Sequence, residues 1–222
     1  MKRGLTTWQQ SLAKPGKPDE WEVKELLRLY GIPTPNGIRI QSKDLIPAPT
    51  FAEPYVLKVC SGEILHKTDR GGVQLNVSRA ALADRIAEMR RAFPGEALLL
   101  EEQVKMKGTE CIVGALVDGE FGPAMMVGAG GILTELYKDV AFRLAPCDQK
   151  EATRMIDELK IAPLFKGFRG ITMSAEALAH VIAAASELVI DLGEAFSQLD
   201  INPVGFVDRE WVALDAKLVL KV

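Results

Sequence analysis

The feature that most constrains the fold is a pair of apolar segments joined by a tight turn in the middle of the chain. The segment ECIVGALV at 110–117 is followed by Asp118-Gly119 and then by the apolar stretch Gly122–Val127. An Asp-Gly pair between apolar runs is a strong hairpin signal, because these residues tolerate the positive φ angles of the turn. The sequence therefore predicts a pair of antiparallel strands at this place.

Further strand and helix signals surround this hairpin. Strand patterns occur at Tyr55–Cys60, Val73–Val77, 97–104, and in the C-terminal segments FSQLDINPVGFV and WVALDAKLVL, which a turn at 208–210 separates. Helices are predicted where a capping residue precedes apolar residues at helical spacing, which happens after Asp19, Ser78, Asp148 and Ser174. The mixture predicts an α+β fold with antiparallel sheets rather than a doubly wound parallel fold.

The composition allows a substantial core. The chain has 222 residues, of which 48% are hydrophobic, so disorder and the fibrous classes are excluded. Residues 1–18 are polar and contain Pro15, Gly16 and Pro18, and we expect them to form a loosely ordered arm on which Trp8 alone could dock.

Charge and cysteine content restrict the partners and the compartment. Lys and Arg number 27 against 30 Asp and Glu, a net charge of −3, which disfavours binding to nucleic acid or to an anionic membrane. No apolar run is long enough to cross a membrane, and the first residues lack the apolar region of a signal peptide. Cys60, Cys111 and Cys147 are widely spaced within or beside apolar runs, which is typical of buried thiols. We expect a cytoplasmic protein.

Two basic residues near the first strand are candidates for phosphate chemistry. Lys58 lies in the middle of the strand YVLKVC, where it either reaches solvent from an edge strand or is aimed at a nucleotide phosphate. His66 lies in ILHKTDRGGV, a polar, glycine-rich stretch that could present backbone N–H groups to phosphate oxygens. Its alternative is an ordinary surface histidine. His180, in contrast, lies off the apolar stripe of its helix and is expected to face solvent.

Acidic strand ends and a glycine cluster form two further candidate sites. Glu101, Glu102 and Glu110 bracket the charged link KMKGT, where they either accept hydrogen bonds from ribose hydroxyls or are simply solvated charges. The cluster GAGG at 128–131 is by itself compatible with a plain turn. Glu135, Lys138 and Arg143 follow it and would give a polar wall with two cations.

Three oxygen-bearing side chains on the C-terminal strands predict a metal site. Asp200 and Asn202 are two residues apart and therefore share one strand face, and a hairpin would bring Asp215 alongside them. Carboxylates that point together repel each other unless a cation lies between them. Hard oxygen ligands of this kind suit Mg²⁺, which also keeps waters and substrate phosphates in its shell.

Taken in order, these segments resemble the ATP-grasp domain, and most closely the beta subunit of ADP-forming acyl-CoA synthetases, relatives of succinyl-CoA synthetase. The resemblance covers about residues 19–220. It is carried by LLRLYGIPTP, VLKVCSGEILHKTDRGGVQL, GTECIVGALVDGEFGPAMMVGAGGILTELYKDVAFRLAP, KGFRG and LDINPVGFVDREWVALDAKLVL. It implies an ATP-grasp fold in which two lobes, 19–109 and 110–222, hold the nucleotide between antiparallel sheets. Gly62 stands where the family commonly has proline, and the stretch between Ile40 and Tyr55 is shorter than usual.

The resemblance also implies roles for individual residues. Lys58 is similar to the phosphate-binding lysine, and Lys138 and Arg143 look like further phosphate contacts. Asn202 and Asp215 match the Mg²⁺ ligands, with Asp200 where the family usually has an acid. His66 falls where the family has a phosphorylatable histidine. The residues implied near adenine and ribose are Glu101, Glu102, Val104 and Glu110.

The implied activity is the reaction acyl-CoA + ADP + phosphate ⇌ acid + CoA + ATP, with Mg²⁺ and ATP or ADP as cofactors. The implied partner is an alpha subunit that carries the CoA-binding domain and its own phosphohistidine loop, so a hetero-oligomer is expected. Two alternatives remain at this point: an ATP-grasp carboxylate–amine ligase, and a nucleotide-sensing domain of a protein acetyltransferase.

Overall fold

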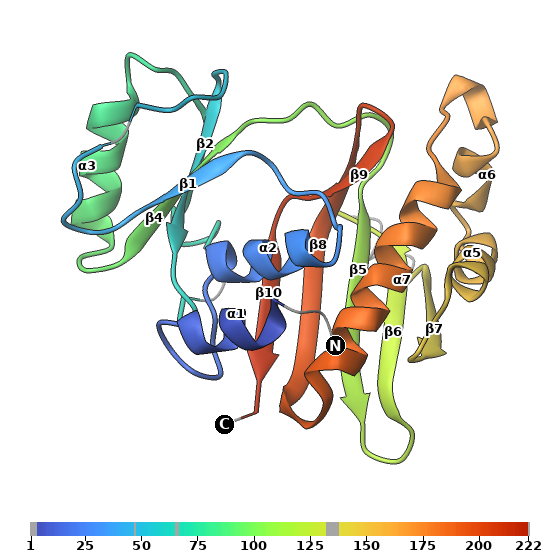
Figure 1. The fold of residues 1–222 in the computed structure, drawn as a ribbon. Helices are drawn as coiled ribbons and strands as arrows, with labels where there is room; N and C mark the ends of the chain where they lie inside the picture. Colours follow the sequence, from blue (N-terminus) through green and yellow to red (C-terminus); the bar gives the residue numbers. More distant parts are fainter. Residues whose placement is uncertain (1–3, 47, 65–66, 132–137, 222) are drawn as a thin grey trace.

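Two antiparallel β-sheets organise the molecule, as the hairpin signal predicts. The computed structural model describes residues 4–46, 48–64, 67–131 and 138–221. Figure 1 shows the two sheets side by side, with helices α1 (Leu5–Ser11) and α2 (Glu20–Leu29) between them. The predicted α+β class is confirmed.

The smaller sheet has four strands in the order β1-β4-β2-β3. Their bounds are Gly37–Ile40 for β1, Tyr55–Cys60 for β2, Val73–Val77 for β3 and Ala97–Glu102 for β4. Helix α3 (Leu82–Ala92) covers one face, where Leu57, Leu98 and Leu100 meet Ile86 in a small apolar core. The other face carries Lys58 and turns toward α2, because side chains alternate along a strand.

The larger sheet has the order β10-β8-β5-β6-β7, with β9 paired to the far end of β8. Its strands are β5 (Cys111–Asp118), β6 (Gly122–Ala129), β7 (Val140–Leu144), β8 (Phe196–Val207), β9 (Glu210–Ala213) and β10 (Ala216–Leu220). Strands β5 and β6 form the predicted hairpin, and the Asp118 carboxylate accepts from the Glu120 and Phe121 N–H groups in its turn.

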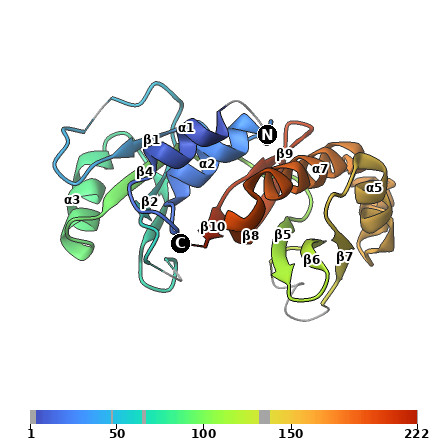
Figure 2. The same cartoon turned by 60° about the horizontal axis from the view of Figure 1, so that its bottom comes forward.

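Helices α5 (Gln149–Glu158) and α7 (Ala175–Leu192) cover one face of this sheet, and the short α6 (Ala162–Phe165) follows α5. Figure 2 shows both long helices on the same side of β5, β6 and β7. The face beneath them contributes Leu199, Ala115 and Met125 to the larger core. We call this the covered face, and the opposite one the open face.

The N-terminal arm is not loose, and on this point the sequence-based expectation was wrong. Residues 5–11 form α1, in which Leu5 is fully buried and Trp8 is 5% exposed. The Trp8 indole donates to the Glu22 carbonyl at 2.7 Å, which ties α1 to α2. Trp8 docks, as expected, and it does so as part of an ordered helix rather than from a loose arm.

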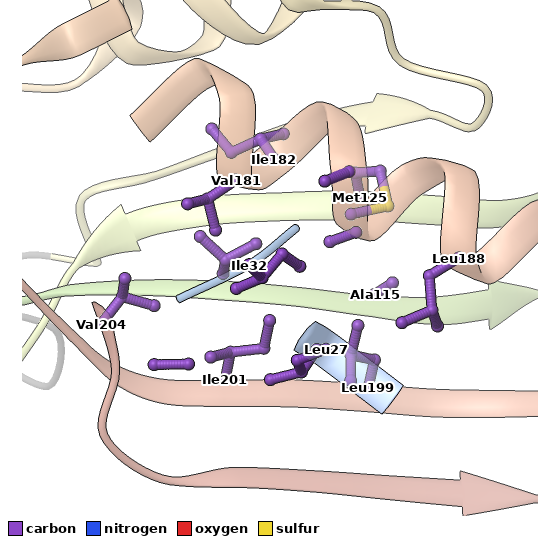
Figure 3. Packing of buried hydrophobic residues seen from close by; sticks show 14 of the residues in the cluster. Leu27, Ile32, Ala115, Met125, Val181, Ile182, Leu188, Leu199, Ile201 and Val204 are labelled. Atoms are coloured by element: carbon purple, nitrogen blue, oxygen red, sulfur yellow. The ribbon is translucent and has the colours of Figure 1, made fainter. Parts of the chain in front are cut away.

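Helix α2 contributes to the core of the larger sheet. Its residues Val23, Leu26 and Leu27 are completely buried there, and Figure 3 shows Leu27 and Ile32 pointing among the side chains of β5, β8 and α7. The sequence analysis assigned this helix to the first lobe, whereas its apolar side chains pack in the core of the larger sheet. The division of the chain into lobes 19–109 and 110–222 stays a prediction.

Helix capping follows the sequence in three places and departs from it in one. Asp19 and Glu22 form the complete capping box of α2, and Asp148 and Ser174 cap α5 and α7. Ser78 does not cap α3: the helix begins at Leu82, and the Ser78 hydroxyl only accepts from the Ala81 N–H at 3.3 Å in the preceding turn. Among the residues described, no helix is sufficiently long and apolar to span a bilayer.

Candidate nucleotide and metal site

A cavity of about 580 Å³ lies where β8 and β10 meet the loop that follows β2. Its walls include Glu20 at the start of α2, Lys67 from the loop, and Asp200, Asn202 and Asp215 from the C-terminal strands. Polar groups from three distant parts of the sequence thus converge on one space, with both carboxylate and ammonium groups at its wall.

The three predicted metal ligands come together through strand pairing. Asp200 lies opposite Lys217 in the β8–β10 ladder, and the Asn202 N–H donates to the Asp215 carbonyl at 3.1 Å. Both Asp200 and Asn202 face the open side of the sheet, because Leu199 and Ile201 between and beside them are buried in the core. Asp200 and Asn202 lie on β8 as predicted, whereas Asp215 lies in the short segment just before β10, where it is still beside them.

The electrostatics of the two aspartates fit a cation. Burial raises the pKa of Asp200, and the neighbouring Asp215 carboxylate raises it further. Burial likewise raises the pKa of Asp215, as does Glu20, while Lys58 and Lys67 partly offset the shift. A bound cation would remove this repulsion. Among the described residues no three His, Cys, Asp or Glu side chains form a metal cluster, so a cation here would need the Asn202 amide oxygen and water or phosphate besides the two aspartates.

Lys58 lies behind this cavity in a buried cluster of charges. Its ammonium donates to Glu20 Oε1 at 2.6 Å and to the Leu214 carbonyl at 2.6 Å, and it lies 3.0 Å from Glu101 Oε2. The alternative of an edge-strand lysine in solvent is wrong, because β2 lies between β4 and β3 and Lys58 is only 7% exposed. Burial alone would lower the pKa of Lys58, but the surrounding carboxylates outweigh it and raise this pKa well above its usual range.

The cluster contains equal numbers of opposite charges. Three ammonium groups, of Lys24, Lys58 and Lys67, face three carboxylates, of Glu20, Glu101 and Asp215. Charge balance explains how so many ionised groups are buried together, since an unpaired buried charge is very costly. Burial would raise the pKa of Glu20, but Lys58, Lys24 and Lys67 hold it well below its usual range.

Sequence reasoning missed Glu20 and Lys24. Lys24 is fully buried, and burial followed by repulsion from Lys58 lowers its pKa, although Glu20 and Glu101 partly restore it. The available signal was their spacing: the two residues are four apart on a helix whose next turns are apolar, so they lie on one face. Leu27 continues the same face with an apolar side chain, so both charges were to be expected to point toward protein rather than solvent.

The acidic residues around the link between the sheets do not act as one group. Glu101 faces the buried cluster and does not reach the cavity. Glu102 accepts from the backbone and side-chain N–H groups of Asn36 at 3.0 Å each. Glu110 lies beside the glycine cluster, where its carbonyl accepts from the Gly130 N–H at 2.8 Å. A Cβ on Gly130 would come within 2.9 Å of the Glu110 backbone carbonyl, so this close approach requires glycine. Val104 is half-buried in the link itself.

Arg143 lies on the opposite side of the sheet from the aspartates. Arg143 lies opposite Met125 of β6, and the same cross-strand row continues to the buried Ala115 and Leu199. Asp200 belongs to the next row, which ends at Phe142 and faces the open side of the sheet. The Arg143 guanidinium forms ion pairs with Glu158 and Glu151 of α5. The structure thus corrects the expected placement of Arg143 as a phosphate contact, because the strand register directs it toward α5.

Lys138 is exposed and does not line the cavity, although it adjoins the buried Asp139 at the start of β7. His66 and Glu135 lie outside the described residues. His180 is exposed on α7, as expected.

Comparison with known proteins assigns the chain to a family. A model of the ATP-grasp domain matches residues 13–220. The beta subunits of two ADP-forming acetate–CoA ligases of Pyrococcus furiosus, I and II, are 37% and 36% identical and are matched over 90% and 91% of both chains.

Solved structures agree with this assignment. A crystal structure from Pyrococcus horikoshii Ot3 has a TM-score of 0.85 at 31% identity and covers 100% of this chain and 99% of that one. The dinucleotide forming acetyl-coenzyme A synthetase 1 of Ca. Korarchaeum cryptofilum, in complex with coenzyme A and Mg-AMPPCP, has a TM-score of 0.80 at 30% identity with full coverage of both chains. The chain therefore belongs to the ATP-grasp family, and over nine-tenths of its length it is similar to the beta subunits of ADP-forming acetate–CoA ligases.

Proposed function

We propose that this chain is the nucleotide-binding beta subunit of an ADP-forming acyl-CoA synthetase, with acetate as the first acid to test. In the overall reaction, acyl-CoA, ADP and phosphate give the free acid, CoA and ATP. The step assigned to this chain transfers a phosphoryl group between a phosphohistidine and ADP. Family membership and the named relatives support this proposal.

The single observation that carries the proposal is the convergence of Asp200, Asn202 and Asp215 with Lys67 on one cavity. Oxygen ligands and an ammonium group at one wall match what a nucleotide phosphate with its cation requires. When bound, Mg²⁺ supplies charge neutralisation to the phosphates. Asp200, Asn202 and Asp215 would hold it.

The lysines would act by exchanging partners. Lys67 now lies 2.5 Å from Glu20 and 3.4 Å from Asp215, and Lys58 is held by Glu20 and Glu101. Phosphate oxygens can replace carboxylates as partners of an ammonium group with little change in local charge. Phosphoryl transfer depends mainly on such positioning and electrostatic stabilisation, so the chain needs few covalent steps of its own.

His66 is the proposed covalent carrier. A neutral imidazole nitrogen attacks the phosphoryl group, the bond from phosphorus to the donor oxygen breaks, and the later transfer to ADP reverses this exchange. Histidine suits this role because its neutral form is available near pH 7. Its neighbour in sequence, Lys67, lies at the cavity wall, which supports the assignment.

The partner proposed from the resemblance is an alpha subunit with the CoA-binding domain and a second phosphohistidine loop. The relatives from Pyrococcus furiosus are named as beta subunits, which supports a hetero-oligomer. The cytoplasm is the proposed compartment, since Cys60, Cys111 and Cys147 are all buried free thiols, as a reducing environment allows.

Titration calorimetry of the purified chain with ADP, in the presence and absence of Mg²⁺, tests nucleotide binding. We expect Mg²⁺-dependent binding but no acyl-CoA formation without the alpha subunit. Absence of binding would refute the nucleotide site. Sustained synthetase turnover by the chain alone would refute the proposal that a separate alpha subunit is needed for acyl-CoA formation.

Labelling with γ-labelled ATP and Mg²⁺ tests His66, with the alpha subunit added where needed. We expect acid-labile, base-stable label on this chain, lost in His66→Asn and retained in the control His180→Asn. A carboxylate–amine ligase would form no such label. Full synthetase activity of the His66→Asn complex would exclude the carrier role.

A further inference from the structure

One backbone carbonyl connects the buried charge cluster to the candidate metal site. The Leu214 carbonyl accepts from Lys24 Nζ at 2.8 Å and from Lys58 Nζ at 2.6 Å. These ammonium groups come from α2 and β2, which lie far apart in sequence from Leu214. Two buried charged donors on one carbonyl form a strong, directional anchor.

The residue that follows this carbonyl is Asp215. The short segment 214–215 joins β9 to β10 and is fixed on its other side by backbone hydrogen bonds: the Leu214 N–H donates to Pro203 O at 3.0 Å, and the Asn202 N–H donates to Asp215 O at 3.1 Å. The two lysines therefore complete the support of the segment that presents the Asp215 carboxylate to the cavity.

Lys24 and Lys58 differ in whether they can keep their hydrogen bond to Leu214 when nucleotide binds. Lys58 is the proposed phosphate ligand and would have to leave Leu214 when nucleotide binds. Lys24 is completely buried, and no atom of it lines the cavity. It lies 2.8 Å from Glu20 and 2.6 Å from Glu101, so one positive charge stays between the two carboxylates while Lys58 moves.

We propose that Lys24 is a positioning residue of the nucleotide site: it holds the Leu214 carbonyl, and with it Asp215, and it stays paired with Glu20 and Glu101 when Lys58 engages phosphate. The inference rests on the proposed function, because Asp215 is taken there as a metal ligand. Lys24 itself touches neither the metal nor the nucleotide in this proposal.

The test uses the full chain with Lys24→Met and Glu101→Gln combined. Removing Lys24 alone leaves a buried carboxylate uncompensated and destabilises the fold, whereas the double variant removes one charge of each sign. Titration calorimetry then gives the Mg²⁺ concentration that half-saturates ADP binding. We expect it to rise at least tenfold in the double variant, with the protein still folded by circular dichroism.

Two controls separate this effect from loss of charge in general. Lys166→Met removes an exposed lysine that does not line the cavity and that forms an ion pair with Asp157, and should change the Mg²⁺ requirement less than twofold. Glu101→Gln alone keeps both lysine contacts to Leu214 and should give a much smaller shift than the double variant. A shift as large as that of the double variant would assign the effect to Glu101 and overturn the proposal, as would a folded double variant with the wild-type Mg²⁺ requirement.

Hydrogen exchange provides a readout that needs no nucleotide. The Leu214 amide should exchange at least tenfold faster in the double variant than in wild type or Lys166→Met, because its segment loses an anchor. Wild-type exchange there would overturn the positioning role even if the chain bound no ADP. Failure of wild-type ADP binding, with the exchange effect present, would instead count against the proposed function alone.

Discussion

The two faces of the larger sheet carry very different side chains although they share the same strands. The covered face presents Ala115, Met125 and Leu199 to α7 and is almost completely buried. The open face presents Asp200 and, farther along the same row, Phe142, which is 50% exposed. The side chains of the covered face stabilise the fold by packing, whereas the open face holds carboxylates that repel each other. The residues expected to stabilise the protein and those expected to bind the ligand thus lie on opposite faces of one sheet.

The largest effect is expected for Leu199→Ala on the covered face. Leu199 is 1% exposed, and deleting most of a buried leucine costs about 2–5 kcal/mol through lost transfer energy and the cavity left behind. Urea denaturation should show this loss. The matched change Asp200→Ala, one residue away, should cost no stability. Similar losses for both would break the comparison between the faces.

The next effect concerns ligand binding rather than stability. Asp215→Ala should weaken Mg²⁺-dependent ADP binding at least tenfold, which corresponds to about 1.4 kcal/mol, while leaving the fold intact. Calorimetry measures the affinity and thermal unfolding measures the fold. Asp84→Asn, an exposed change on α3, serves as the control. Unchanged affinity in Asp215→Ala would place the metal elsewhere.

A smaller effect should appear in the pH dependence of stability. Burial and Asp215 raise the pKa of Asp200, so its ionised form is disfavoured in the folded state. Stability from this group is fully present below the ordinary aspartate pKa and is lost as the pH rises through the raised value. Asp200→Asn should therefore be more stable than wild type at pH 7, by up to about 1 kcal/mol for relieved like-charge repulsion.

The difference should shrink as the pH falls toward 4, since wild-type Asp200 then becomes neutral as well. Denaturation curves of both proteins between pH 4 and pH 8 measure it. A constant difference over this range would mean that the effect has a cause other than the Asp200 charge.

The smallest effect is expected for Arg143→Met. Arg143 pairs with Glu158 and Glu151 at the surface, and exposed ion pairs contribute about 0–1 kcal/mol. Because Arg143 lies on the side of the sheet opposite Asp200, ADP affinity should remain within twofold of wild type. A tenfold loss of ADP affinity would show that Arg143 contributes to nucleotide binding despite lying on the opposite face of the sheet.

The sequence predicted those features that depend on local signals. The Asp118-Gly119 hairpin, the caps at Asp19 and Ser174, and the shared face of Asp200 and Asn202 follow from turn chemistry and from the two-residue period of a strand. The fold class could therefore be predicted, and the metal-ligand set stays a prediction.

Features that depend on pairing between distant segments could not. Arg143 was assigned to the site from its place after a glycine cluster, yet its direction is set by which residue of β6 lies opposite it. Lys24 pairs with a carboxylate 77 residues away and with a carbonyl 190 residues away, and no local pattern contains either partner.

The position of α1 and α2 also affects how the chain reaches its native state. Leu5 and Leu27 belong to the same core as β8 and β10, and the Leu220 N–H donates to the Gly16 carbonyl at 2.9 Å. During synthesis, these early apolar residues remain without their partners until the C-terminal strands leave the ribosome. Contacts between distant segments slow folding, and exposed apolar surface favours association in the meantime. The larger core is thus completed only after β10 has been made, and the apolar faces of α1 and α2 stay uncovered until then.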